Sequence, residues 1–227
     1  MIAENLKIVE DRIEEICLKS GRNRSEIRLI GVSKTQPVQV INEAIEAGIK
    51  DLGENKAQEL RDKSDLIQAD ISWHFIGHLQ SNKVKFVIKS ARYIHSVDSV
   101  KLADEINRKA ESINKIQNVL LEINTSSEAS KFGLKNEDEI FETARFCQNS
   151  RNLKLAGLMT MAPYTDDKDI LRKCFVSLRL LKDNLNTAGF DLTELSMGMT
   201  NDYEIAIEEG ATMIRIGTAI FGERNYK

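Results

Sequence analysis

The chain of 227 residues has a formal net charge of -3, with 30% charged and 41% hydrophobic residues. This is the composition of an ordinary folded protein, and its slightly acidic balance argues against nucleic acid as a partner. The first residues lack the pattern of a signal peptide and no apolar run reaches the length of a membrane span, so we expect a cytoplasmic protein.

Strand-like and helix-like segments alternate along the chain. Apolar residues recur at helical spacing over residues 2–19, and an apolar run at 29–32 then predicts a short strand that is buried on both faces. A helix opened by Pro37 and stopped by Gly48 follows. Further strands, each followed by a helical segment, are predicted at 51–55, 73–77, 93–97, 119–124, 155–160, 195–197 and 213–217.

This alternation predicts parallel strands joined by right-handed crossovers. Eight strands favour a closed (β/α)8 barrel, the TIM barrel, with an additional helix at the amino end, and a doubly wound open sheet is the alternative. No linker, low-complexity tract or shift in composition divides the chain. We therefore expect residues 1–227 to form a single domain.

The first predicted strand runs into Ser33 and Lys34. On a period of two, Lys34 shares a face with Val32 and Ile30, so its amine would emerge over an apolar interior. Such a setting disfavours the ammonium form and lowers the pKa of the lysine, and a neutral amine can attack an aldehyde. From this stretch alone an exposed lysine at a strand end is the favoured interpretation, and a Schiff-base lysine is the alternative that this placement suggests.

Two loops carry the residue types that bind phosphate. In barrels of this class a phosphate commonly binds at the loops after strands seven and eight. Residues 196–202 leave the seventh strand with hydroxyls, a glycine and a helix start, where backbone N–H groups favour an anion. Gly217 and Thr218 leave the eighth strand just before another helix. A helix cap or tight turn is the alternative for each loop.

Two further residues are candidate ligand contacts. Arg215 lies among apolar residues and shares a strand face with Met213 and Gly217. If that face is the barrel interior, the guanidinium needs a partner, either an internal carboxylate or an acceptor on a ligand ring. Asn55 ends a strand and either hydrogen-bonds a ligand or caps a helix.

No metal site is expected. His74 and His78 have the spacing of a helical zinc pair, but Gly77 and the strand-to-loop context deny them a common helical face. The three cysteines are widely spaced, form no Cys-x-x-Cys pair and are typical of small reduced hydrophobic residues.

Several stretches resemble the pyridoxal phosphate homeostasis proteins, a family of alanine-racemase-like proteins of one domain. They are GVSKT at 31–35, LGEN at 52–55, HFIGHLQSNK at 74–83, GLM at 157–159, SMGM at 196–199 and RIGTAIFG at 215–222. The resemblance covers nearly the whole chain. It implies a barrel like that of alanine racemase, with pyridoxal 5'-phosphate (PLP) linked to Lys34 as a covalent aldimine.

The same resemblance implies roles for the other candidate residues. Arg215 would face the pyridine nitrogen, Asn55 would lie near the cofactor, and the phosphate would be held by Ser196, Gly198, Gly217 and Thr218. Thr200 stands where family members more often have serine, and it keeps the hydroxyl.

The residues favour binding of the cofactor over its use in catalysis. A cofactor acting as a strong electron sink usually has a carboxylate that keeps its ring nitrogen protonated, whereas arginine cannot accept that proton. Racemisation also needs an acid or base on each face of the substrate. Alanine racemases supply the second from a tyrosine on an additional domain, which we do not expect here, and nothing places Tyr164 or Tyr203 opposite Lys34.

We therefore predict a non-enzymatic protein that stores, buffers or delivers PLP in vitamin B6 homeostasis, with no catalytic residue. A PLP-dependent amino-acid racemase or related lyase is the alternative. The expected partners are PLP and PLP-dependent apo-enzymes. No apolar stripe beyond the core-facing ones demands a partner subunit, so we expect a monomer.

Overall fold

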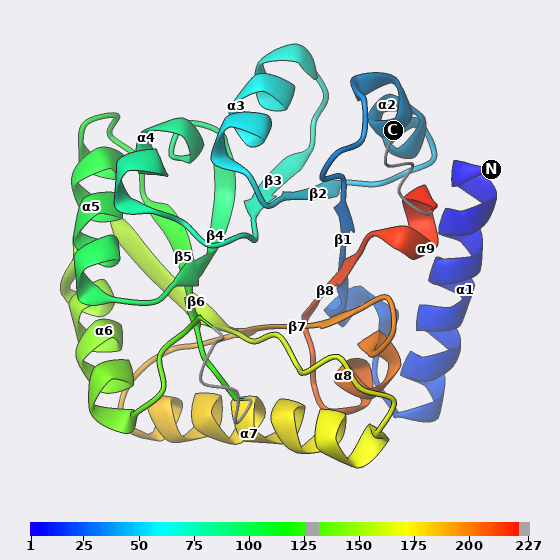
Figure 1. Cartoon of the computed structure of the whole chain (residues 1–227). Coiled ribbons are helices and arrows are strands. Elements are labelled where there is room, and N and C mark those ends of the chain that lie inside the picture. Colours follow the sequence, from blue (N-terminus) through cyan, green and yellow to red (C-terminus); the bar gives the residue numbers. More distant parts are fainter. Residues whose placement is uncertain (126–131, 223–227) are drawn as a thin grey trace.

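The chain folds into a closed barrel of parallel strands surrounded by helices (Figure 1). The structure is a computed structural model, and it describes residues 1–125 and 132–222. Neighbouring strands pair in the order of the sequence, and the last strand pairs with the first. The predicted (β/α)8 barrel is confirmed, and the open-sheet alternative is wrong.

The described strands are β1 (Arg28–Val32), β2 (Asp51–Glu54), β3 (Ser72–Phe75), β4 (Ala91–Val97), β5 (Gln117–Glu122), β6 (Leu153–Met159), β7 (Glu194–Met199) and β8 (Met213–Ile216). The described α-helices are α1 (Ile2–Lys19), α2 (Val38–Glu46), α3 (Ala57–Leu66), α4 (Val84–Val87), α5 (Val100–Glu111), α6 (Glu137–Asn149), α7 (Lys168–Thr187), α8 (Tyr203–Glu208) and α9 (Thr218–Phe221). None of them is both long enough and apolar enough to span a membrane.

The additional helix α1 covers the side of the barrel where the chain closes on itself. Its apolar residues at helical spacing, from Ile2 to Cys17, are buried as the pattern predicts. It packs against α2, α8 and α9, and Asn5 Nδ2 donates to the Ile220 carbonyl at 3.1 Å. Figure 1 shows α1 and α9 side by side.

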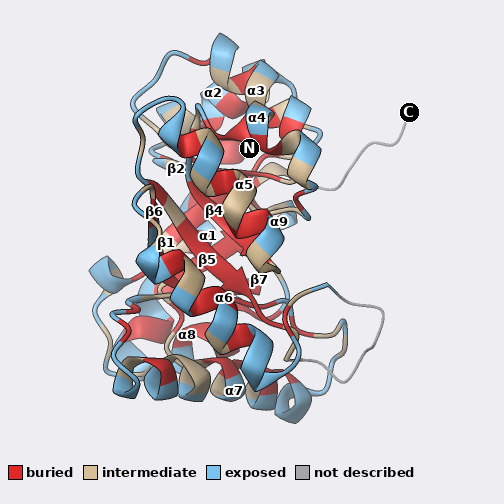
Figure 2. Ribbon diagram, turned by 90° about the vertical axis from the view of Figure 1, so that its left-hand side faces the viewer, coloured by how far each residue is buried: buried red, intermediate tan, exposed pale blue. Residues whose placement is uncertain are grey.

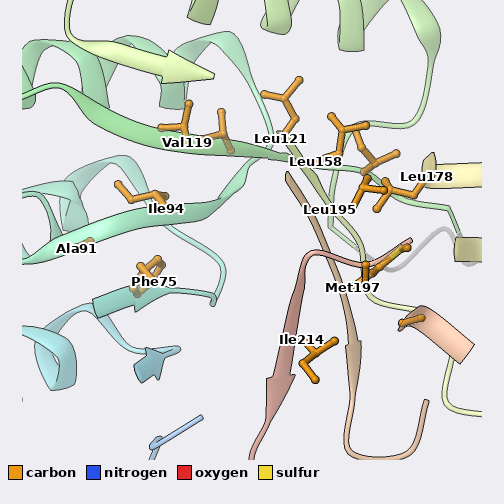
Figure 3. Packing of buried hydrophobic residues seen from close by; sticks show 14 of the residues in the cluster. Phe75, Ala91, Ile94, Val119, Leu121, Leu158, Leu178, Leu195, Met197 and Ile214 are labelled. Atoms are coloured by element: carbon orange, nitrogen blue, oxygen red, sulfur yellow. The ribbon is translucent and has the colours of Figure 1, made fainter. Parts of the chain in front are cut away.

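Most of the core lies between the strands and the surrounding helices. Buried residues fill the strands and the inward faces of the helices, and exposed residues lie on the outer faces (Figure 2). Side chains of this layer include Val119, Leu158 and Leu195 from strands and Leu178 from α7 (Figure 3). Most strands contribute alternate residues to this layer, so their other residues point into the barrel. In β4 and β6 the alternation is interrupted where the pairing shifts.

The barrel interior is only partly apolar. Its apolar cluster contains Ile30, Tyr93, Leu120, Ala156, Met159 and Met213. Ile30 belongs to this inner cluster and Leu29 to the outer one, which confirms the strand face predicted for the residues leading to Lys34. Met213 is also in the inner cluster, so Arg215 points into the barrel. Fully buried polar side chains, His74, His95 and Ser196, occupy further positions inside.

Candidate functional site

A cavity of about 550 Å³ opens at the carboxyl end of the barrel. Its lining residues come from the ends of β1, β5, β7 and β8 and from segments that follow the strands other than β4, and active sites lie at this end of the barrel in this fold. Five residues predicted from the sequence line it together, namely Lys34, Asn55, Arg215, Gly217 and Thr218. The predicted residues Ser196 and Gly198 are not among the lining residues.

Both chain neighbours of Lys34 are held by α3. Lys63 Nζ donates to the Ser33 carbonyl at 2.7 Å, and Glu59 Oε1 accepts from the Thr35 amide at 2.6 Å. A further contact of 2.7 Å joins Lys63 to Glu59. Thr35 has a φ of 66°, a conformation that a β-branched residue rarely adopts unless its surroundings impose it. The half-buried Lys34 therefore projects from a backbone that is fixed on both sides.

Glu54, Glu59 and Lys63 together hold the backbone beside Lys34, and we call them the Lys63 clamp. Glu54 does not line the cavity. Its Oε1 accepts from the Ser33 hydroxyl and from Lys63 Nζ, both at 2.7 Å, and the residue is fully buried. Burial raises the pKa of its carboxyl, against the opposing effect of Lys63. Since successive strand residues point to opposite faces, the next residue, Asn55, points into the cavity.

Arg215 lies at the base of the cavity and is only 4% exposed. Its Nη1 donates to Ser196 Oγ at 2.6 Å, and its Nη2 donates to the Thr160 carbonyl at 2.9 Å. Burial lowers the pKa of Arg215 to about 10, which Asp202 and Glu122 oppose. No carboxylate of the described residues lies within 4.0 Å, so an internal ion pair does not account for this buried cation.

Ser196 and Gly198 lie behind the cavity wall. Ser196 is fully buried, and its hydroxyl oxygen lies 2.9 Å from His95 Nδ1 in addition to Arg215. Gly198 has a φ of 94°, and an added Cβ would lie 2.9 Å from the Tyr203 Cα. Glycine is needed there because the chain passes close to α8. The next three residues of this loop, Met199, Thr200 and Asn201, line the cavity instead.

Glu122 is a cavity residue that the sequence analysis missed. It is 3% exposed, and its Oε2 has no hydrogen-bond partner among the described residues. Burial raises the pKa of this carboxyl to about 7, and Asp98 adds to the effect while Arg215 opposes it. Near neutral pH the cavity therefore contains a carboxyl group that is partly protonated and able to donate a hydrogen bond.

Replacing Glu122 by glutamine is expected to change how stability depends on pH. The folded wild type holds this proton more tightly than the unfolded chain, whose pKa is near 4.5, so this group lowers stability as the pH rises toward about 7. As the pH rises from 4.5 to about 7, the free energy of unfolding of Glu122→Gln should increase relative to that of the wild type by roughly 1–3 kcal/mol. Urea unfolding at pH 5 and pH 8 measures it, with the exposed Glu14→Gln as control. An equal difference at both pH values would contradict the assignment.

His74 and His78 do not face each other. His74 is buried inside the barrel, where its Nε2 lies 2.8 Å from Asp51 Oδ1. His78 lines the cavity, stacks on Phe132 at a ring distance of 4.0 Å and lies 3.5 Å from Asp98. His74 lies in β3 and His78 lies after it, outside any helix, so the two do not share a helical face.

Comparison with known proteins identifies the family. The family model for the N-terminal domain of alanine racemase matches residues 9–225. The pyridoxal phosphate homeostasis protein of Aquifex aeolicus is 44% identical over 227 residues, covering 98% of each chain. The chain belongs to the pyridoxal phosphate homeostasis protein family. The resemblance inferred from the sequence motifs is thereby confirmed.

Solved structures extend this relationship. PipY of Synechococcus elongatus, solved with PLP bound, is 33% identical, with a TM-score of 0.85 over 98% of this chain and 100% of that chain. The alanine racemase of Clostridium difficile is 18% identical, with a TM-score of 0.80 over 99% of this chain and 58% of that chain. At that identity the likeness to the racemase shows the shared barrel alone.

In this member of the pyridoxal phosphate homeostasis family, many of the cavity residues outside the predicted site come from loops, whereas Glu122 is the last residue of β5. Gln36, His78, Tyr164 and Asn201 follow four different strands and meet only once the barrel is closed. His95 had a usable signal, because it lies two residues after the inward-facing Tyr93.

Proposed function

We propose that this chain binds PLP at the cavity and stores, buffers or delivers it without catalysing a reaction, with residues 1–227 acting as one cofactor-binding domain. One observation carries the proposal: the cavity brings together a lysine on a fixed backbone and a buried arginine that lacks a carboxylate partner among the described residues. The 33% identical PipY, solved with PLP bound, supports it.

The residues present fit the chemical groups of PLP. When bound, PLP supplies an aldehyde that a lysine amine can join covalently, and Lys34 is the cavity residue for that attachment. Gly217 and Thr218 would hold the phosphate where β8 passes into α9. Arg215 has five N–H donors and uses two on protein oxygens, which leaves donors for the pyridine nitrogen.

A second observation supports the fit. Asn55 Oδ1 and Glu122 Oε2 are buried and have no hydrogen-bond partner among the described residues, although both side chains line the cavity. Buried polar atoms in folded proteins are nearly always hydrogen-bonded, so such atoms indicate a site that is completed by a polar ligand.

The cavity is poorly equipped for racemisation. Arg215 has only N–H donors, so it cannot accept a hydrogen bond from a protonated ring nitrogen and does not stabilise the positively charged ring. Of the two tyrosines considered as a second acid or base, Tyr203 does not line the cavity, and Tyr164 is 94% exposed at its rim. A side chain so free in solvent is not held in one place for proton transfer.

We propose that PLP-dependent apo-enzymes receive the delivered cofactor and that the protein acts as a monomer. Its cysteines are free thiols, all buried, as is usual in the reducing cytoplasm.

Two assays on the PLP-loaded protein test the function. In the first, PLP is transferred to an apo-enzyme, and delivery predicts faster activation than by the same concentration of free PLP. Equal or slower activation would contradict delivery and leave storage. In the second, L- and D-amino acids are followed stereochemically with Lys34→Ala as control. Turnover that depends on Lys34 and clearly exceeds that of free PLP would establish the racemase or lyase alternative.

A further inference from the structure

Four hydrogen bonds link five side chains into one line across the barrel. His74 Nε2 lies 2.8 Å from Asp51 Oδ1, and His74 Nδ1 lies 2.9 Å from His95 Nε2. His95 Nδ1 lies 2.9 Å from Ser196 Oγ, which accepts from Arg215 Nη1 at 2.6 Å. This Asp51–Arg215 chain starts at the first residue of β2 and ends at the cavity.

The two ends fix the direction of every bond. Arginine can only donate, and a carboxylate can only accept, so His74 Nε2 carries a hydrogen. A neutral imidazole has one donor and one acceptor nitrogen, so His74 Nδ1 accepts from His95 Nε2. His95 Nδ1 then accepts from the Ser196 hydroxyl. All four bonds donate in one direction, from Arg215 toward Asp51.

The surroundings favour the neutral rings that this direction requires. His74 and His95 are fully buried, and burial lowers the pKa of both, that of His95 well below 6.5. Tyr93 stacks on His74 at a ring distance of 5.1 Å and an interplanar angle of 7°, which holds the ring plane. Bonds that donate in one direction polarise one another, so the carboxylate charge strengthens Ser196 Oγ as an acceptor.

We infer that the other four residues of the Asp51–Arg215 chain are positioning residues, which hold Arg215 in the orientation from which it donates to a ligand in the cavity. Ser196 and the Thr160 carbonyl take one hydrogen from each terminal guanidinium nitrogen and so fix its plane. The inference rests on the proposed function, in which the ligand acceptor is the pyridine nitrogen of PLP. The single proton of Ser196 is donated to His95, so Ser196 acts through Arg215 and does not donate to the phosphate.

The apo protein gives the first test without any substitution. The chain has three histidines, of which His74 and His95 lie in the line and His78 lies outside it. In protein with ¹⁵N-labelled imidazoles at neutral pH, we expect a scalar coupling across the hydrogen bond from His95 Nε2 to His74 Nδ1, with both rings protonated at Nε2. Absence of that coupling, or protonation of either ring at Nδ1, would overturn the inference.

PLP titrations give the second test. Ser196→Ala removes the acceptor of Arg215, and we expect the Kd for PLP to rise roughly tenfold, a usual effect of losing a residue that orients a binding group. Asp51→Asn keeps an oxygen acceptor for His74 and removes the charge, so a smaller rise of about threefold is expected. Asp11→Asn, on the exposed surface of α1, is the matched control and should leave the Kd unchanged.

The outcomes separate the inference from the function on which it rests. Wild-type binding of PLP, with Ser196→Ala and Asp51→Asn both at the wild-type Kd, would overturn the positioning role and leave the proposed function standing. A wild-type protein that takes up no PLP would overturn the proposed function, and with it the ligand assigned to Arg215. If Ser196→Ala does not fold, Asp51→Asn and the nitrogen coupling of the wild type still decide.

Discussion

Replacing Lys63 by methionine is expected to lower the free energy of unfolding by about 3–5 kcal/mol at neutral pH, the scale for breaking a buried ion pair by removing one partner. Lys63 is 7% exposed, and it donates to Glu54, Glu59 and the Ser33 carbonyl, all at 2.7 Å. Its loss leaves the fully buried Glu54 with the Ser33 hydroxyl as its remaining hydrogen-bond donor among the described residues.

The cost of Lys63→Met should grow as the pH rises. Burial already raises the pKa of Glu54 in the wild type, and Lys63 is the largest influence opposing that rise. Without it the folded state holds the Glu54 proton still more tightly than the unfolded chain, so stability is lost as the pH rises above about 4.5. The loss is therefore smaller at pH 5 than at pH 8.

Urea unfolding at these two pH values measures the effect, with two companion variants. Lys63→Met/Glu54→Gln should recover much of the loss, because glutamine needs no counter-charge and can still accept from Ser33. Lys7→Met, which removes an exposed ion pair on α1, should unfold like the wild type. A Lys63→Met protein as stable as the Lys7→Met protein would show that the Lys63 clamp contributes nothing to the fold.

Replacing Gly77 by alanine should damage the cavity itself. An added Cβ would lie 2.2 Å from the Asn55 carbonyl oxygen and 2.7 Å from its Cα, and backbone atoms cannot rotate out of the way as side-chain atoms do. Both residues line the cavity, so the substitution should displace Asn55. We expect a loss of about 1–3 kcal/mol in unfolding free energy. The Kd for PLP should rise roughly tenfold, equivalent to about 1.4 kcal/mol.

The control for Gly77→Ala is the same substitution at Gly31. There the added Cβ would lie 2.6 Å from Ile49 Cδ1, the far end of a flexible side chain that can change rotamer. Gly31→Ala should therefore lose less stability and keep the wild-type affinity for PLP. Urea unfolding and a PLP titration of both variants check the comparison, and equal losses in the two would contradict the steric explanation.

Local sequence patterns predicted the barrel because each acts within one element. The alternation of Ile30, Val32 and Lys34 with outward residues follows from the period of a strand, and it brings Lys34 to the cavity. Ser99 and Asn136 are residue types that favour helix starts, and they cap α5 and α6 by accepting from backbone amides.

The sequence pattern fails where strands must be placed against one another. Ser196 is on an inward position of β7, but the sequence does not show how far below the cavity it lies. That depth depends on the β7–β8 register, which shifts between Ser196 and Met199. The bond between His74 and His95 likewise depends on the β3–β4 register, which shifts after Trp73. Hydrogen bonds between side chains on different strands depend on these registers, and the periodicity within a single strand does not specify them.

Binding of PLP to this cavity through Lys34 should be visible in the absorption spectrum of the purified protein, recorded with and without added PLP. We expect a visible band on PLP addition that is absent in Lys34→Ala, and borohydride should bleach this band while leaving the cofactor covalently attached to the protein. A wild-type protein that stays colourless, or a Lys34→Ala protein with the same band, would contradict it.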